Sequence, residues 1–241
     1  MRPVFPYDSE LAAAVRAPAH SIADVVSTLR TIDAICVDTD GLKWFNGLYL
    51  QVTEAVAARV SASGFSSAEW LAILDVQFAQ LYFDALQSAL DGGRCPGCWD
   101  IMFQSRSNKR LARIQFALAG MNAHINRDLP QAIIATCRTT RTAPLHGTPQ
   151  YTDYTSVNAT LDSLIDTART TLQVRLPGDP LPSISHLEQT IAAWKVSAAR
   201  EAAWQNAEVL WNLPVPLIDG LKHSIDGFTT VVGKALLVPV P

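Results

Sequence analysis

The chain is poor in charge and in cysteine, and it has no long uninterrupted apolar stretch. Only 17% of its 241 residues are charged and the formal net charge is −3, so it lacks the basic stripe that binds nucleic acid. No apolar run approaches the roughly 18 residues that cross a bilayer. The first residues also lack the cationic and apolar segments of a signal peptide. These absences predict a cytoplasmic protein that neither inserts into a membrane nor binds nucleic acid.

Four cysteines are too few for disulfides to stabilise a chain of this length. Cys95 and Cys98 form a single CxxC in a stretch that is typical of a loop, while Cys36 and Cys137 stand alone. A zinc ribbon needs a second such pair. A thioredoxin-like motif lies at a strand–helix junction, and no βαβ pattern surrounds this one. The spacing therefore favours two incidental thiols in a turn over a redox or zinc role.

The common cofactor and nucleophile motifs are missing as well. The chain has no GxGxxG, no Walker loop, no GxSxG elbow and no ExxH di-iron motif. Their absence argues against the common nucleotide-binding proteins, serine hydrolases and di-iron proteins. It predicts that any activity of this chain needs no cofactor.

Helical periodicity dominates what is present, and strand-like alternation is hard to find. Helices are predicted over residues 22–36, 42–62, 67–90, 109–138 (with a break near Pro130) and 186–212, with a shorter one over 157–172. Loops are predicted over residues 91–97, 142–155 and 176–182. Without a repeat or a long linker, the pattern predicts one all-α domain over residues 1–241, a single-domain bundle of orthogonally packed helices. Its core is expected at about 20–212, with an apolar C-terminal tail at 213–241 docked on it. A tail that lines a pocket or contacts a second copy is the alternative.

Three of the predicted helices place polar side chains on their apolar faces. At 100° per residue, Asp75 lies opposite the solvent arc of its helix and beside Tyr82. The other inward polar residues are Asn46, Tyr49, Gln115, Asn122 and Asn126. Buried polar groups are costly unless each finds a partner. Three such helices predict a polar pocket in an apolar body, which is the usual form of a small-molecule site.

His124 and Asp128 are spaced i, i+4 and can meet on one side of a helix. Asp128 could orient the imidazole as a general base, or both side chains could ligate a metal. The third interpretation is structural. Asp128 stands before Leu129 and Pro130 like a helix N-cap, and His124 would then be a core histidine.

Arg200 is the preferred partner for a buried carboxylate such as Asp75, and it could stack on Trp204, which shares its helix face. An ion pair of this kind would make Asp75 structural. Without it, Asp75 is a candidate functional carboxylate.

Four segments carry a family resemblance: DGLKWFNGLYLQVT, LDVQFAQLYFDAL, IQFALAGMNAHINRDLP and AREAAWQNAEVLW. Together they resemble a microbial family of proteins of unknown function. The resemblance spans roughly Thr31 to Trp211, and the HIN-x-DLP segment is its most specific part. It implies a single helical domain and assigns no activity.

The inward polar set predicts an enzyme of specialised metabolism that performs cofactor-free acid/base chemistry on a largely apolar small molecule. Cyclisation, isomerisation, elimination and hydrolysis all fit it. We expect His124 as acid or base, Asp128 as its orienter and Asp75 as a second acid/base. The substrate-binding residues are expected to be Asn122, Asn126, Asn46, Tyr49, Tyr82, Gln115, Arg200 and Trp204.

Three alternatives remain open, and a homodimer is compatible with each. One is a metal-dependent hydrolase with His124, Asp128 and Asp75 as ligands. Another is a non-catalytic binding protein for a lipophilic ligand. The last is a purely structural hydrogen-bond network.

Overall fold

The computed structural model describes residues 4–62, 64–173 and 195–239, and their regular structure is entirely helical, which confirms the predicted all-α bundle. The elements are α1 (Asp8–Ala14), α2 (Ile22–Ile35), α3 (Gly41–Ser61), α4 (Ala68–Leu90), α5 (Gly97–Ser105), α6 (Arg113–Asn122), the π-helix η1 (Ala123–Asp128), α7 (Leu129–Thr140), α8 (Pro149–Ser156), α9 (Asn158–Gln173), α11 (Val196–Asn212) and α12 (Val215–Leu236). Among the described helices, none combines the length and the apolar character that crossing a membrane requires.

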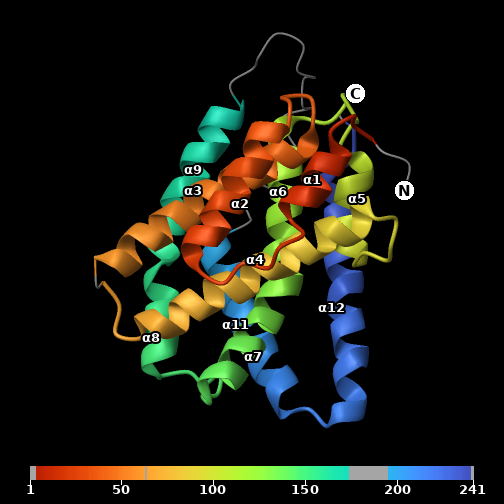
Figure 1. Cartoon of the computed structure of the whole chain (residues 1–241). Coiled ribbons are helices and arrows are strands. Elements are labelled where there is room, and N and C mark those ends of the chain that lie inside the picture. The colour runs from red at the N-terminus through yellow and green to blue at the C-terminus, as the bar shows by residue number, and fades with distance from the viewer. Residues whose placement is uncertain (1–3, 63, 174–194, 240–241) are drawn as a thin grey trace.

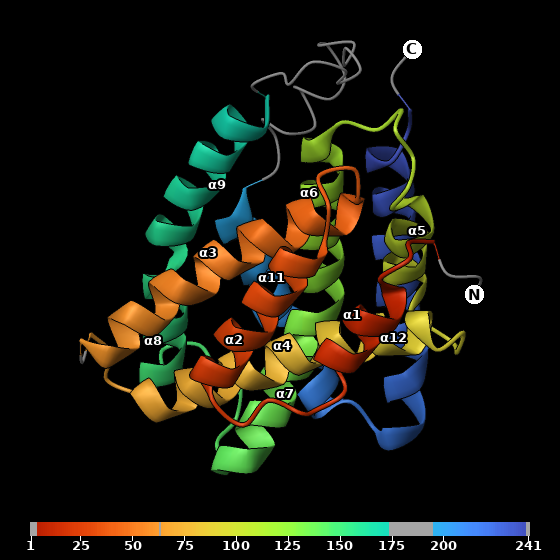
Figure 2. The same cartoon turned by 45° about the horizontal axis from the view of Figure 1, so that its top comes forward.

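The elements α6, η1 and α7 follow one another without a break and form a central rod (Figure 1). Helix α3 packs on α6, while α11 packs on η1 and α7, and α12 packs on α5, α6 and η1. Helix α4 runs across this rod in both views (Figures 1 and 2). The π-helix η1 is therefore enclosed by α4, α5, α11 and α12, and four of its six residues, His124 and Asp128 among them, are buried.

The rod continues through the point where the sequence predicts a break. Asp128 has helical backbone angles (φ −84°, ψ −39°) and its side chain makes no capping bond, so the N-cap interpretation of this residue is wrong. Pro130 has no N–H to donate, and it follows closely on the π turn, which ends at Asp128. The side-chain Nε2 of Gln131 donates to the carbonyl oxygen of Arg127, at 3.0 Å. Helical segments of the π type occur frequently at functional sites.

Two helices lie at least partly in stretches that the sequence predicts as loops. Helix α8 begins at Pro149, where the hydroxyl of Thr148 accepts a bond from the backbone N–H of Tyr151, at 3.2 Å. Helix α5 begins at Gly97 because Asp226 of α12 accepts the first N–H groups of α5. A cap supplied from 129 residues away leaves no local sequence signal. Of the helix predicted over 186–212, the part before residue 195 lies outside the described residues.

The C-terminal piece forms the 22-residue helix α12. Two of the inward amides hold it in place. Nε2 of Gln115 donates to the carbonyl oxygens of Leu236 and Val238, at 2.7 and 2.9 Å. Nδ2 of Asn122 donates to the carbonyl oxygen of Thr229, at 2.9 Å. Because both amides are buried, these bonds satisfy groups that would otherwise be costly.

Gly120 brings α6 directly against the fully buried ring of Phe45 on α3, and a Cβ at position 120 would overlap that ring. We expect Gly120→Ala to lower the free energy of unfolding by about 1–3 kcal/mol, because overpacking a dense core forces side chains and backbone to shift. Urea unfolding followed by circular dichroism measures this loss.

Gly47→Ala in α3 is the control, since its Cβ meets only Asp33 Oδ1, at 3.5 Å. Alanine should gain about 0.5–1 kcal/mol there by helix propensity. Equal stabilities for the two variants would contradict the close packing.

Candidate functional site

His124 lies on η1 inside a set of aromatic side chains from α3, α4 and α5, which we call the aromatic box. The ring of Phe78 stacks on the imidazole, with 3.5 Å between centroids and 7° between planes. The ring of Tyr49 meets it edge-on at 4.5 Å. The other members are Phe45, Trp99 and Tyr82, at 5.8, 5.9 and 6.2 Å. The imidazole is therefore only 1% exposed and has apolar walls on most sides.

The i, i+4 spacing does bring His124 and Asp128 together, with Nδ1 of the imidazole 3.2 Å from Oδ2 of the carboxylate. The same Oδ2 accepts a bond from Nε1 of Trp99 at 2.8 Å, and Oδ1 accepts one from Nη1 of Arg127 at 2.6 Å. A carboxylate only accepts, so Nδ1 of His124 is the donor of the pair. Its other nitrogen, Nε2, is left with a free lone pair.

Three buried polar atoms around the aromatic box have no hydrogen-bond partner: Nε2 of His124, Oη of Tyr49 and Oδ2 of Asp75. Burial raises the pKa of Tyr49 well above its usual value, and the charges of Asp75 and Asp128 raise it further. Both carboxyl groups are thus close enough to act on this one hydroxyl. Buried polar atoms without partners are rare in native proteins and call for an explanation.

The pKa values of two of these groups move in directions that suit proton transfer near neutral pH. Burial raises the pKa of Asp75 to about 7, from an ordinary value of 3.8. Asp75 as a residue is partly exposed, but its Oδ2 is shielded from solvent. Burial lowers the pKa of His124, while the hydrogen bond and charge of Asp128 act against this. At neutral pH the imidazole is therefore neutral, with its one proton on Nδ1, and Asp75 can both release and accept a proton.

The predicted amides do not surround a common hollow. Nδ2 of Asn46 donates to the carbonyl oxygen of Leu29 at 2.8 Å, and its Oδ1 accepts from Tyr82 at 3.4 Å. Nδ2 of Asn126 donates to Oδ1 of Asn122 at 2.9 Å. Together with Gln115 and Asn122, which hold α12, these amides bond to the protein itself. These amides therefore hold the helices of the bundle together.

The expected pairing of Arg200 with Asp75 is wrong. Nε of Arg200 donates to Oδ1 of Asn158 and Nη2 to the carbonyl oxygen of Tyr154, both at 2.7 Å. The guanidinium lies over the ring of Tyr154, at 4.0 Å from its centroid. Trp204 packs against the same ring, at 4.9 Å, and does not stack on Arg200. Arg200 thus joins α11 to α8 and α9, and Trp204 joins α11 to α8 and α4, away from the aromatic box.

Neither metal nor redox chemistry finds support in the donor groups. Across the part of the chain that the structure describes, no three histidine, cysteine, aspartate or glutamate side chains are placed to hold a metal ion, so His124, Asp128 and Asp75 do not form a ligand set. Burial raises the pKa of Cys95 to about 12, and the charges of nearby aspartates, Asp100 foremost, add to this. Burial raises the pKa of Cys98 as well. Protonated thiols are poor nucleophiles, which favours the incidental interpretation of the CxxC.

An open groove of about 1260 Å³ lies elsewhere, between α1, α2 and α3. Its apolar lining includes Ile22, Val26 and Val60, and the exposed ion pair of Arg30 with Glu54 lies in it. None of the predicted site residues lines this groove. The aromatic box is therefore separate from it.

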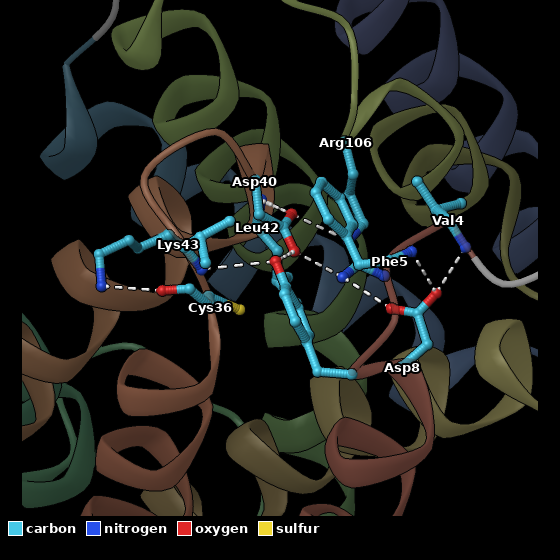
Figure 3. A network of polar contacts seen from close by, with 10 residues as sticks. Val4, Phe5, Asp8, Cys36, Asp40, Leu42, Lys43 and Arg106 are labelled. Atoms are coloured by element: carbon cyan, nitrogen blue, oxygen red, sulfur yellow. Dashed lines mark hydrogen bonds and ion pairs between the residues drawn. The ribbon is translucent and has the colours of Figure 1, made fainter.

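A second buried polar cluster, which the sequence interpretation missed, surrounds Arg106 (Figure 3). Its guanidinium donates to both oxygens of Asp40, at 3.0 and 2.6 Å, and Nη2 lies 3.0 Å from Oδ1 of Asp8. Oη of Tyr7 donates to Asp40 at 3.1 Å, and Asp40 also accepts the N–H of Leu42 at the start of α3. These bonds join α1, α3 and the end of α5. Because its carboxylates and its guanidinium bond to one another, we assign this cluster to the stability of the fold.

The chain belongs to a family of unknown function, DUF5995, whose model matches residues 22–239. This agrees with the resemblance drawn from the four sequence segments. No curated protein and no solved structure matches the chain. The function must therefore be argued from the site itself.

Proposed function

We propose that this protein is an enzyme that moves protons on a largely apolar small molecule at the aromatic box. One observation carries the proposal. Nε2 of His124, Oη of Tyr49 and Oδ2 of Asp75 are buried without partners, aromatic rings surround the imidazole, and the charge of Asp75 acts on the hydroxyl of Tyr49. An apolar site with a few unsatisfied polar groups is the usual form of a small-molecule site.

Each of the three groups has a chemical role in this proposal. His124 takes a proton at Nε2, with Asp128 holding its tautomer through Nδ1. Asp75, with a pKa raised to about 7, gives a proton to the substrate or receives one from it. Tyr49 stays protonated and donates a hydrogen bond to a substrate oxygen. Cyclisation, isomerisation, elimination and hydrolysis all use this set of groups.

Phe78 controls access in this proposal. Its ring lies flat on the imidazole of His124, and Phe78 is partly exposed, whereas Phe45, Tyr82 and Trp99 are fully buried. A substrate that enters from this side displaces the phenyl ring, and its reacting C–H or O–H has to lie in the plane of the imidazole, where the Nε2 lone pair points. A flat, conjugated part of the same molecule can take over the stacking contact that Phe78 makes.

The test uses isotope exchange, because this readout does not require the natural substrate. The protein is incubated in D2O with a panel of enolisable aryl ketones, 1,3-diketones and conjugated enones, and in H2¹⁸O with aryl lactones. Mass spectrometry then measures the label in each compound. We expect label from at least one compound and at least tenfold less with His124→Gln, since general acid–base catalysis contributes about 10²–10⁴-fold.

His20→Gln is the matched control, because His20 is exposed and lies outside the aromatic box. It should exchange label like the original protein. If a compound binds tightly and no label enters it, a non-catalytic binding protein is the better description. Exchange that is the same in His124→Gln and His20→Gln would overturn the proposed roles.

A further inference from the structure

One side of α12 carries a regular row of residues that we call the α12 seam: Leu217, Leu221, Ser224, Phe228, Val231 and Ala235. All but Leu221 are exposed, and Leu221, at the edge of the row, is half-buried and also packs on the core of its own chain. The spacing along the row alternates between four and three residues. Leu217, Phe228 and Val231 are 56%, 69% and 64% exposed. Of the eight large hydrophobic residues exposed in the described part of the chain, five lie between residues 215 and 238. Four of these five lie on α12, so the exposed apolar surface is concentrated on this helix.

The 4–3 alternation distinguishes this seam from ordinary surface hydrophobicity. A spacing that averages 3.5 residues keeps one stripe of a helix facing a second helix along its whole length, as in coiled coils. The opposite side of α12 is already occupied, since Thr229, Gly233 and Leu236 are buried against α5, α6 and η1. A helix with a second apolar stripe outside its own core is expected to bind a second partner through that stripe.

We propose that the α12 seam is a homodimer interface, in which α12 packs antiparallel against α12 of a second copy of this chain. This inference is independent of the proposed function.

The order of side-chain sizes along the seam selects the antiparallel arrangement. A two-fold axis at residue 226 places Leu217 opposite Ala235 of the partner and Leu221 opposite Val231. It also places Ser224 opposite Phe228, so that each layer pairs a large or medium side chain with a smaller one. A parallel pair would set Phe228 against Phe228 and Ala235 against Ala235, which crowds one layer and leaves another hollow. The seam is therefore complementary to its own reversed copy, as an isologous interface requires.

The glycines beside the seam agree with a close helix pair. A Cβ added at Gly220 or Gly227 would meet nothing within 4 Å, so the partner helix can approach closely on that side.

The size of the contact sets the expected affinity. The seam spans residues 217–235, which corresponds to about 28 Å of helix. A single helix pair of this length falls at the low end of specific interfaces, below about 1,200 Å² in total. We therefore expect a dimer that dissociates reversibly in the micromolar range.

Sedimentation velocity over a concentration series from about 1 to 200 µM tests the seam. The full chain should shift from monomer to dimer, and Phe228→Asp should weaken the dimer at least tenfold. Leu145→Asp is the matched control, because Leu145 is 52% exposed but lies outside α12. Circular dichroism spectra must show both variants folded. A chain that stays monomeric throughout, or a Leu145→Asp variant that is weakened equally, would overturn the proposal.

Cysteine cross-linking tests the orientation. The proposed axis puts the two copies of residue 227 within about 3 Å of each other along the helix direction, and the two copies of residue 235 about 27 Å apart. Under mild oxidation Gly227→Cys should form a disulfide-linked dimer, while Ala235→Cys and the unmodified chain should not. Cross-linking of both variants would mean a parallel pair, and cross-linking of neither would exclude the seam as the interface. Either result overturns the proposal.

Discussion

Replacing Asp40 by alanine should destabilise this protein more than any other single change considered for it. We expect Asp40→Ala to lower the free energy of unfolding by about 3–5 kcal/mol, because it leaves the guanidinium of Arg106 buried without its bidentate partner. The side chain of Arg106 is 3% exposed and that of Asp40 is fully buried, so water cannot replace the lost bonds. The variant also removes the cap on Leu42 N and the acceptor of Tyr7 Oη. Urea unfolding at pH 7 measures the loss.

Two further variants separate this cause from the others. Asp38→Ala removes an exposed carboxylate two residues away and should change stability by less than about 0.5 kcal/mol. Adding Arg106→Met to Asp40→Ala should recover part of the loss, because in Asp40→Ala the buried guanidinium keeps only Asp8 as a charged partner. If the double variant were less stable than Asp40→Ala, the loss would have to come from the cap and from packing.

The elements that could be predicted from the sequence are those with a strong local signal. The helices at 22–35, 41–61 and 68–90 follow from apolar periodicity, and their bounds lie within a residue or two of the prediction. Helix α5 could not be predicted from local pattern, since its N-terminus is capped by Asp226. Asp128 carries the local signature of an N-cap but lies inside a continuous helical rod, where its side chain bonds to Arg127 and Trp99. At α5 a tertiary contact replaces the signal that a local cap would leave.

The same distinction explains the success and the failures at the candidate site. His124 and Asp128 could be paired because their spacing on one helix decides the contact. Trp99 was missed as the second partner of Asp128 because it lies on α5. The pairing of Arg200 with Asp75 failed because nothing in a helical wheel fixes how two helices are rotated about each other. A wheel shows which side chains face inward, and the partner comes from packing.

Asp75→Asn should change how the stability of the protein depends on pH. Burial raises the pKa of Asp75 to about 7 in the folded chain, whereas the ordinary value is 3.8. Between these values the folded state holds a proton that the unfolded state has released, so stability falls as pH rises from about 4 to 7. Asparagine does not titrate. The stability of the variant relative to the original protein should therefore rise over this range, by about 2–4 kcal/mol.

The measurement is a set of urea unfolding curves from pH 4.5 to 8.5, and its readout is the change in the difference between the two proteins. Asparagine also places an amide where Oδ2 has no partner, but this cost is independent of pH and leaves the slope unchanged. Asp84→Asn, at an exposed position of the same helix, controls for the loss of a charge on α4. Parallel curves for Asp75→Asn and the original protein would contradict the raised pKa.

This slope bears directly on the proposed function. An asparagine at position 75 would spare the fold the cost of ionising a buried carboxyl, so stability alone does not account for an aspartate there. Acid/base catalysis does, because a group with a pKa near the working pH exchanges its proton most effectively. We expect Asp75→Asn to gain stability relative to the original protein as pH rises, and also to lose isotope exchange. Together these results would mean that the carboxyl supports the reaction and destabilises the fold, as is common for catalytic residues.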